Sequence, residues 1–448
     1  MSYLPRIFKI LAAVLVLCLI GSFLWLYFAS PALLRVGAGY TAKIVCSNVF
    51  LAGRDPEEVL TVDVQAPGHP LLKLMKVEVD RDEKRVRAAL LGFIASNEAV
   101  YREGLGCAAV PEHVSAVPAP SALGQASGGG PDAFWPNGDI VESDQAVAAV
   151  LSDAAFTGSA MRAVLVVRDG RIIGERYGEG FSADTPLLGW SMTKTVNAAI
   201  IGTLMREGRL EPDQRALLPQ WSGDPREDIT LADLLSMEDG LSFNENYGSV
   251  TDVTQMLYLE PDMAAFAAAA PLVTGPGTSF SYSSGSAVLL SRIWMNAFAD
   301  QMVALRYPNH ALFRPLGMRS AVLETDAAGT FVGSSYMYAT GRDWARFALL
   351  LLRDGVWDGT RILPEGFVGL MAEPNGTSGG RYSKMQTWLP GEDEADLPAD
   401  TFFLQGHDGQ TIAVIPSLDL AVVRLGLTPR RDGYDVTPLV RRIVELSK

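Results

Sequence analysis

The pattern of apolar and polar positions predicts strands at both ends of the region beyond residue 140 and helices between them. Apolar runs typical of strands occur at residues 162–168, 171–177, 401–405, 411–415 and 420–425. Stretches with the spacing of a helix occur at residues 231–237, 263–270, 287–298, 342–354 and 364–373. This arrangement predicts an α/β (α+β) fold, in which one antiparallel sheet is flanked by helices and carries a helical subdomain.

A further helical stretch, residues 191–205, is almost wholly apolar after its first turn. A helix that is apolar on all sides is a buried one. Ser191 and Lys194 stand three residues apart at its start, which places them on one face. Burial disfavours a charged ammonium, so a buried lysine can act as a base toward a serine hydroxyl. The alternative is a chance spacing, with Lys194 extending to solvent.

The first segment of the chain is also apolar. Residues 10–34 contain no charged residue and follow Arg6 and Lys9. A cleaved signal peptide has an apolar core of roughly 7–15 residues, whereas about 20 residues span a bilayer. We therefore predict one N-terminal transmembrane helix within residues 1–34, a membrane-anchored protein and an exported catalytic domain, on the periplasmic face of the inner membrane in a Gram-negative cell. A signal peptide cleaved near residues 29–32 is the alternative.

Composition divides the exported part into three regions. Residues 35–115 predict a small appended module, residues 116–139 are rich in Pro, Gly and Ser and predict a linker, and residues 140–448 form the main domain. Cys46 and Cys107 both lie in the appended module. In an oxidising compartment such a pair predicts a disulfide. Two buried free thiols are the alternative.

The net charge of −14 argues against nucleic-acid binding, which needs basic patches. The sequence has only four histidines and no H-x-x-x-H or C-x-x-C spacing, which argues against a metal site. We therefore predict no nucleic-acid partner, no metal and no cofactor. The sequence gives no indication of the oligomeric state.

Two further motifs place polar side chains in loops. Residues 280–285 read Phe-Ser-Tyr-Ser-Ser-Gly and precede an apolar helical stretch, so Tyr282 lies at a loop-to-helix junction from which a phenol can move a proton. Residues 406–410 read Gly-His-Asp-Gly-Gln between two predicted strands, where glycines allow a substrate to approach the backbone. Taken alone, the Tyr282 position favours a packed tyrosine whose hydroxyl is hydrogen-bonded, and the His407 position is equally consistent with a turn residue.

In this order, the three motifs resemble the S-x-x-K, Y-x-N and K-T-G elements of the serine β-lactamase and penicillin-binding-protein superfamily. The likeness is stronger to its class C-like branch, the family VIII carboxylesterases and 6-aminohexanoate-dimer hydrolases. It covers about residues 140–448, with supporting stretches at residues 229–241, 312–318 and 338–347. The resemblance implies the β-lactamase/D,D-peptidase-like fold and a catalytic serine.

The resemblance also implies a role for each residue that matches the motifs. Ser191 would be the acylated nucleophile, Lys194 its base, and Tyr282 the relay that protonates the leaving group. The backbone N–H groups of Ser191 and Gln410 would form the oxyanion hole. The residues implied in substrate binding are Tyr247, Ser284, His407 and Gly409.

Two positions depart from the superfamily pattern. Ser284 stands where an asparagine is usual, and His407 replaces the lysine of K-T-G, which commonly receives a substrate carboxylate. These departures favour the esterase and amidase branch. We therefore predict a serine hydrolase that cleaves a small ester or amide through an acyl-enzyme on Ser191. The alternatives are a D,D-peptidase or β-lactamase, and a non-enzymatic binding or sensor protein on the same scaffold.

Overall fold

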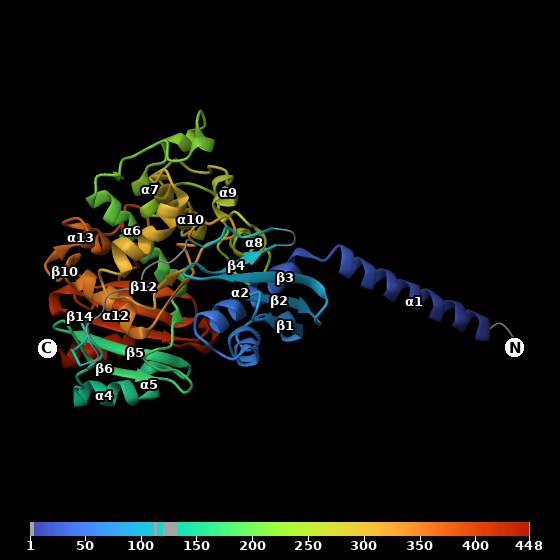
Figure 1. Cartoon of the computed structure of the whole chain (residues 1–448), viewed down its shortest axis with the longest axis horizontal. Coiled ribbons are helices and arrows are strands. Elements are labelled where there is room, and N and C mark those ends of the chain that lie inside the picture. The colour runs from blue at the N-terminus through green and yellow to red at the C-terminus, as the bar shows by residue number, and fades with distance from the viewer. Residues whose placement is uncertain (1–3, 112–113, 120–131, 448) are drawn as a thin grey trace. The chain divides into compact units, whose positions relative to one another are not determined.

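The computed structural model describes residues 4–111, 114–119 and 132–447 and divides into two compact units (Figure 1). The first unit comprises Met1–Tyr101, Cys107–Ser115 and Asn246–Pro261. The second comprises Arg102–Gly106, Ala116–Glu245 and Asp262–Lys448. Residues 120–131, in the middle of the predicted linker, lie outside the described residues. The segment 246–261, which the sequence analysis assigns to the main domain, clusters with the N-terminal residues.

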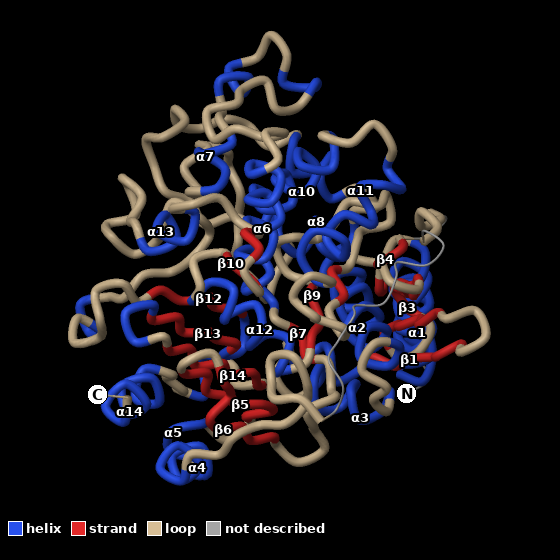
Figure 2. Tube along the Cα trace, turned by 60° about the vertical axis from the view of Figure 1, so that its left-hand side comes forward, coloured by secondary structure: helices blue, strands red, loops and turns tan. Residues whose placement is uncertain are grey.

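The second unit is built on a five-stranded antiparallel sheet (Figure 2). Its strands lie in the order β12 (Phe402–Gly406), β13 (Gln410–Ile415), β14 (Leu420–Gly426), β5 (Met161–Arg168) and β6 (Arg171–Tyr177). β14 pairs with β5, so strands from the two ends of this region meet in the middle of the sheet. The predicted antiparallel sheet is confirmed. Two smaller sheets are also present. One has the strand order β7 (Leu187–Leu188), β9 (Met337–Ala339) and β8 (Val322–Leu323), and the other pairs β10 (Val356–Trp357) with β11 (Thr360–Arg361).

Helices cover both faces of the five-stranded sheet. α4 (Gln145–Ser152) and α14 (Thr437–Leu446) pack with the side chains of Val164 and Val166 in one core. α12 (Gly341–Leu352) packs against β5, β13 and β14. The backbone of Gly341 is so close to Leu165 that a Cβ there would lie 2.6 Å from Leu165 Cδ1. Because side chains alternate along a strand, Leu165 points to the sheet face opposite to that of Val164 and Val166. α12 therefore covers one face, and α4 and α14 cover the other.

The remaining helices of this unit form the predicted helical part. They are α6 (Thr193–Arg206), α7 (Leu231–Leu235), α9 (Met263–Ala268), α10 (Ser284–Asn296), α11 (Gln301–Pro308) and α13 (Phe367–Ala372). The exception is the short helix α5 (Ala154–Thr157), which packs with α4 and α14. Each stretch predicted as helical between the strands lies on α7, α9, α10, α12 or α13. All residues of α6 from Thr193 to Leu204 are buried, and α6 packs against α10. The prediction that this stretch is a buried helix is confirmed.

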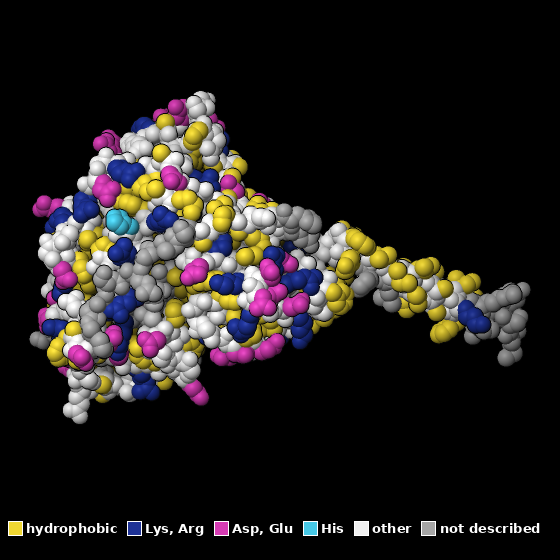
Figure 3. Space-filling view, viewed as in Figure 1, with side chains coloured by type: hydrophobic (Ala, Val, Ile, Leu, Met, Phe, Trp, Pro, Cys, Tyr) yellow, Lys and Arg dark blue, Asp and Glu magenta, His cyan; other side chains and the backbone are white. Residues whose placement is uncertain are grey.

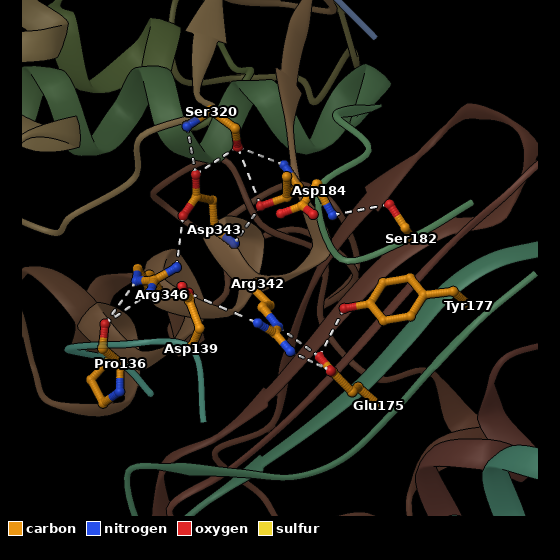
Figure 4. A network of polar contacts seen from close by, with 11 residues as sticks. Pro136, Asp139, Glu175, Tyr177, Ser182, Asp184, Ser320, Arg342, Asp343 and Arg346 are labelled. Carbon is orange, nitrogen blue, oxygen red and sulfur yellow. Dashed lines mark hydrogen bonds and ion pairs between the residues drawn. The ribbon is translucent and has the colours of Figure 1, made fainter. Parts of the chain in front are cut away.

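A polar network fixes the start of α12 (Figure 4). Arg342 donates to both carboxylate oxygens of Glu175 on β6, at 3.0 and 2.6 Å. Arg346 donates to Asp343 at 2.8 Å and to the backbone oxygen of Pro136 at 2.9 and 3.0 Å. These contacts join α12 to β6 of the sheet and to the backbone at Pro136, which precedes the sheet in the chain.

The first unit combines helices with a four-stranded antiparallel sheet. Its helices are α1 (Leu4–Phe28), α2 (Ala32–Phe50), α3 (Pro56–Glu58) and α8 (Asp252–Leu259). Its strands lie in the order β1 (Met75–Asp80), β2 (Arg85–Leu90), β3 (Ile94–Arg102) and β4 (Gly106–Val110). The predicted disulfide is present and joins Cys46 on α2 to Cys107 on β4, with Cα atoms 6.1 Å apart. α8 packs on α2, where Asn97 donates to the backbone oxygen of Tyr258 at 3.0 Å.

α1 carries exposed apolar side chains along its length (Figure 3). The uncharged stretch predicted over residues 10–34 is divided between two helices. α1 ends at Phe28 and α2 begins at Ala32 because Pro31, which lacks an N–H group, stands before the second helix. In the part of the chain that the structure describes, no helix is both long enough and apolar enough to cross a membrane. The structure therefore does not support the predicted transmembrane helix.

Candidate active site

Ser191 lies in a tight 3-10 turn (Trp190–Met192) that leads into α6. Trp190 has a φ of +48°, which is rare for a bulky residue. Such a conformation persists only where the surroundings fix it. The Trp190 ring is buried, with its centroid 6.0 Å from that of Tyr336 and 5.6 Å from that of His407. The turn therefore holds Ser191, which is half-buried, in a fixed orientation.

Lys194 is buried and points toward Ser191. Its Nζ donates to Ser191 Oγ at 3.3 Å, to Ser284 Oγ at 3.1 Å and to the backbone oxygen of Ser334 at 3.1 Å. Ser191 lies in the 3-10 turn instead of the first α-helical turn, but residues three apart also share a face in a 3-10 helix. The predicted contact between Ser191 and Lys194 is present. The alternative, a lysine extending to solvent, is wrong because only 1% of the side chain is exposed.

Tyr282 lies at the predicted junction, just before α10, and presents the face of its ring to Lys194. The ammonium lies 4.6 Å from the ring centroid, a distance typical of a cation–π contact. The Tyr282 ring packs against Tyr382 and Trp388, with centroids 5.8 and 5.2 Å apart. The aromatic cluster thus fixes Tyr282 beside the Ser191–Lys194 pair. Its role in proton transfer stays a prediction.

The structure adds Glu245 to this group, a residue that the sequence analysis does not single out. One carboxylate oxygen accepts from Ser284 Oγ at 2.6 Å, and the other accepts from the Ser284 backbone N–H at 2.8 Å. Ser284 and Glu245 are 39 residues apart, so no local pattern joins them. Ser334 was also missed, because its contribution is a backbone oxygen, which has no signature in sequence.

The third motif lies against the turn that carries Ser191. A Cβ at Gly406 would lie 2.2 Å from the backbone oxygen of Gly189, so only glycine fits there. Beyond it, His407 Nε2 lies 3.3 Å from Asp408 Oδ1, and burial raises the pKa of the Asp408 carboxyl. The fold therefore brings the first and third motifs together, as the resemblance implies. The oxyanion hole formed by the N–H groups of Ser191 and Gln410 stays a prediction.

Buried hydrogen bonds hold the loop of the third motif. The side-chain amide of Gln410 donates to the backbone oxygen of Gly426 at 2.6 Å, and its oxygen accepts from the Gly426 N–H at 2.9 Å. The Arg424 guanidinium donates to the backbone oxygen of Gly409 at 2.9 Å. Arg424 is fully buried, and burial lowers its pKa. The loop is thus attached to β14 at two points.

Tyr247 lies in the segment that clusters with the first unit, and 41% of its side chain is exposed. Its assignment to substrate binding stays a prediction, as do those of Ser284, His407 and Gly409. Among the described residues, no group of three His, Cys, Asp or Glu side chains is placed to hold a metal ion.

The sequence profile of the family described as Beta-lactamase matches residues 144–439. The chain belongs to the beta-lactamase family. The protein is a serine hydrolase of the serine β-lactamase and penicillin-binding-protein superfamily. The resemblance stated from the motifs is confirmed.

Individual members of the beta-lactamase superfamily give the same result. The chain is 25% identical over 298 residues to a 6-aminohexanoate-dimer hydrolase of Paenarthrobacter ureafaciens, covering 60% of this chain and 73% of the relative. A family VIII carboxylesterase structure matches with a TM-score of 0.55 and 16% identity, over 69% of this chain and 98% of the other. The structure of a penicillin-binding protein from Bacillus halodurans matches with a TM-score of 0.52 and 18% identity, over 68% of this chain and 99% of the other. The predicted β-lactamase-like fold is confirmed.

A buried carboxyl in the same unit makes stability depend on pH. Burial raises the pKa of Asp239 to about 6. Because this pKa is higher in the folded than in the unfolded state, the folded protein holds the proton more tightly. The resulting stabilisation is present below about pH 4 and is lost as the pH rises through about 6. Asp239→Asn should therefore stabilise the protein at pH 8 by roughly 3 kcal/mol and leave it unchanged at pH 4.

Urea unfolding at pH 4 and pH 8 checks this prediction. The control is Asp213→Asn, which neutralises an exposed aspartate and should shift neither midpoint. Equal stabilisation by Asp239→Asn at both pH values would contradict the titration of Asp239 as its cause.

Proposed function

We propose that the protein hydrolyses a small ester or amide through a covalent acyl-enzyme on Ser191. The observation that carries this proposal is the buried Lys194 Nζ, 3.3 Å from Ser191 Oγ. An adjacent base is what makes a serine hydroxyl nucleophilic. The positive end of α6 also favours negative charge at this position.

In the proposed reaction, neutral Lys194 accepts the proton of Ser191 Oγ as this oxygen attacks the carbonyl carbon. The N–H groups of Ser191 and Gln410 bind the resulting oxyanion. The bond to the leaving alkoxide or amine then breaks, and Tyr282 relays the proton from Lys194 to that group. Water attacks the acyl carbon in the second half and gives its proton to Lys194. The acid is released, and the proton returns to Ser191 Oγ.

The departures at two motif positions support an ester or amide over a β-lactam. A histidine is not a permanent cation as a lysine is. A substrate carboxylate therefore lacks a permanent cation at position 407, where the superfamily has a lysine. Relatives named as a 6-aminohexanoate-dimer hydrolase and a family VIII carboxylesterase support the same branch.

The test is the intact mass of the full chain after treatment with a fluorophosphonate. We expect a single adduct on the parent protein and on Ser182→Ala, which removes an exposed serine. We expect no adduct on Ser191→Ala. A folded parent without an adduct would support the non-enzymatic alternative, and a stable penicillin adduct on Ser191 would support the D,D-peptidase or β-lactamase alternative.

We further propose that residues 1–34 hold the enzyme at a membrane, with the catalytic domain exported. Two observations support this localisation: the exposed apolar side chains of α1, and a disulfide of the kind that persists in oxidising compartments. The full chain should remain in washed membranes, whereas a chain that begins at residue 31 should be released. Equal release of both chains would exclude anchoring by this segment.

A further inference from the structure

We infer that Glu245 is a positioning residue of this active site, which acts on Lys194 through Ser284. This inference rests on the proposed function of the Ser191–Lys194 pair. Both oxygens of the Glu245 carboxylate are used, at 2.6 Å from Ser284 Oγ and 2.8 Å from the Ser284 backbone nitrogen. Ser284 is fully buried and lies 3.1 Å from Lys194 Nζ. A continuous chain of hydrogen bonds therefore runs from Glu245 to Ser191.

The direction of these hydrogen bonds is fixed. A serine hydroxyl has one proton to donate, and Ser284 gives it to Glu245 because a carboxylate can only accept. The Ser284 oxygen is then left with lone pairs that accept from Lys194. The carboxylate also lies at the N-terminus of α10, where the helix dipole favours negative charge. Glu245 thus orients Ser284 as a permanent acceptor for Lys194.

The arrangement places a negative charge near Lys194, which forms no direct ion pair with any described residue. The three hydrogen bonds of Lys194 Nζ go to two hydroxyl oxygens and one backbone oxygen. A carboxylate in direct contact would hold the lysine in its charged form and prevent it from acting as a base. At one hydroxyl's distance, Glu245 stabilises the ammonium that forms when Lys194 takes the proton of Ser191.

The same charge should affect the pH profile of labelling at Ser191. Fluorophosphonate labelling of Ser191 should become faster with rising pH, because only an unprotonated base can accept the proton of a serine hydroxyl. In Glu245→Gln the charge is gone, and only the amide oxygen can accept from Ser284, because the NH2 group can only donate. We expect this rise to move to lower pH, by about one pH unit or less. At pH values above this rise, kcat of Glu245→Gln for 4-nitrophenyl acetate should be about 10-fold lower than that of the parent, with little change in KM.

Further variants separate this role from a structural one. Ser284→Ala removes the hydroxyl that accepts from Lys194 but keeps the Glu245 charge, so it should move the rise in the same direction, and the double variant should move it further. Glu245→Asp restores the charge and should return the rise toward the parent. The matched control is Glu238→Gln, because Glu238 is also a buried glutamate that accepts from a hydroxyl, Thr377 Oγ1 at 2.6 Å. It should not move the rise.

The outcomes distinguish this inference from the proposed function. Labelling of the parent at Ser191, with an unmoved rise in both Glu245→Gln and Ser284→Ala, would overturn the role of Glu245 alone. A lower melting temperature with an unmoved rise would show that Glu245 only caps α10. A parent that is not labelled at Ser191 would overturn both proposals, since no base would then be acting there. If Glu245→Gln fails to fold, Ser284→Ala decides the question.

Discussion

Replacing Lys194 by methionine should lower kcat/KM for 4-nitrophenyl acetate by a factor of about 1,000 to 10,000. Methionine keeps an unbranched side chain of similar length but has no group that accepts a proton. Ser191 Oγ would lose its base, and the aromatic and hydroxyl groups around Nζ cannot replace it. Ser191→Ala and the double variant should be no worse than Lys194→Met, because residues that act as a unit are not additive.

Lys43 provides a matched control for this substitution. It is also a buried lysine, with 1% of its side chain exposed, and its Nζ donates to Ser47 Oγ at 2.9 Å within α2. Lys43→Met removes a buried ammonium beside a serine, as Lys194→Met does, but in the first unit. It should change the melting temperature and leave kcat/KM within about twofold. If Lys194→Met kept more than a tenth of the activity, the assignment of Lys194 as the base would be wrong.

The part of the site that could be predicted is local in sequence. Ser191 and Lys194 lie one turn apart, so the apolar pattern that predicts a buried helix also predicts their contact. Their partners come from elsewhere in the chain: Ser334 offers a backbone oxygen, and Glu245 reaches Ser284 across 39 residues. Such contacts depend on tertiary packing, and no spacing rule reports them.

The backbone at the nucleophile was also beyond prediction. Trp190 adopts a positive φ that its size disfavours, and packing against other rings maintains it. Local propensity predicts a plain helix start at this position. Departures of this kind are expected at functional sites, where tertiary structure overrides local preference.

The fold could be predicted where periodicity is strong and where consecutive elements pair. The strands of the large sheet follow from their apolar runs, and β5–β6 and β12–β13–β14 pair consecutively along the chain. The pairing of β14 with β5 joins the two ends of the region and is not a local feature of the sequence. The N-terminal region was predicted less well. Pro31 divides the apolar stretch into two helices, and segment 246–261 packs with the N-terminal residues through α8 and α2. Composition does not report such a long-range association.

Replacing both Cys46 and Cys107 by alanine should destabilise the first unit by about 4 kcal/mol. The disulfide joins residues separated by 61 positions and connects α2 to β4. A cross-link over a loop of this length restricts the unfolded chain strongly, and its loss returns that entropy to the unfolded state. Cys46→Ala with Cys107→Ala should therefore lower the urea midpoint of the first unit, as followed by a probe placed there.

The chain supplies its own control for this experiment. Cys18 is free and exposed, so Cys18→Ser changes a cysteine without touching the cross-link, and its urea midpoint should equal that of the parent. Thiol titration of the denatured, unreduced parent should find Cys18 reactive, and reduction should add Cys46 and Cys107. If those two thiols titrate before reduction, the disulfide is absent from the isolated protein. If they do not, an unchanged midpoint in the double variant would mean that packing of α2 alone stabilises this unit.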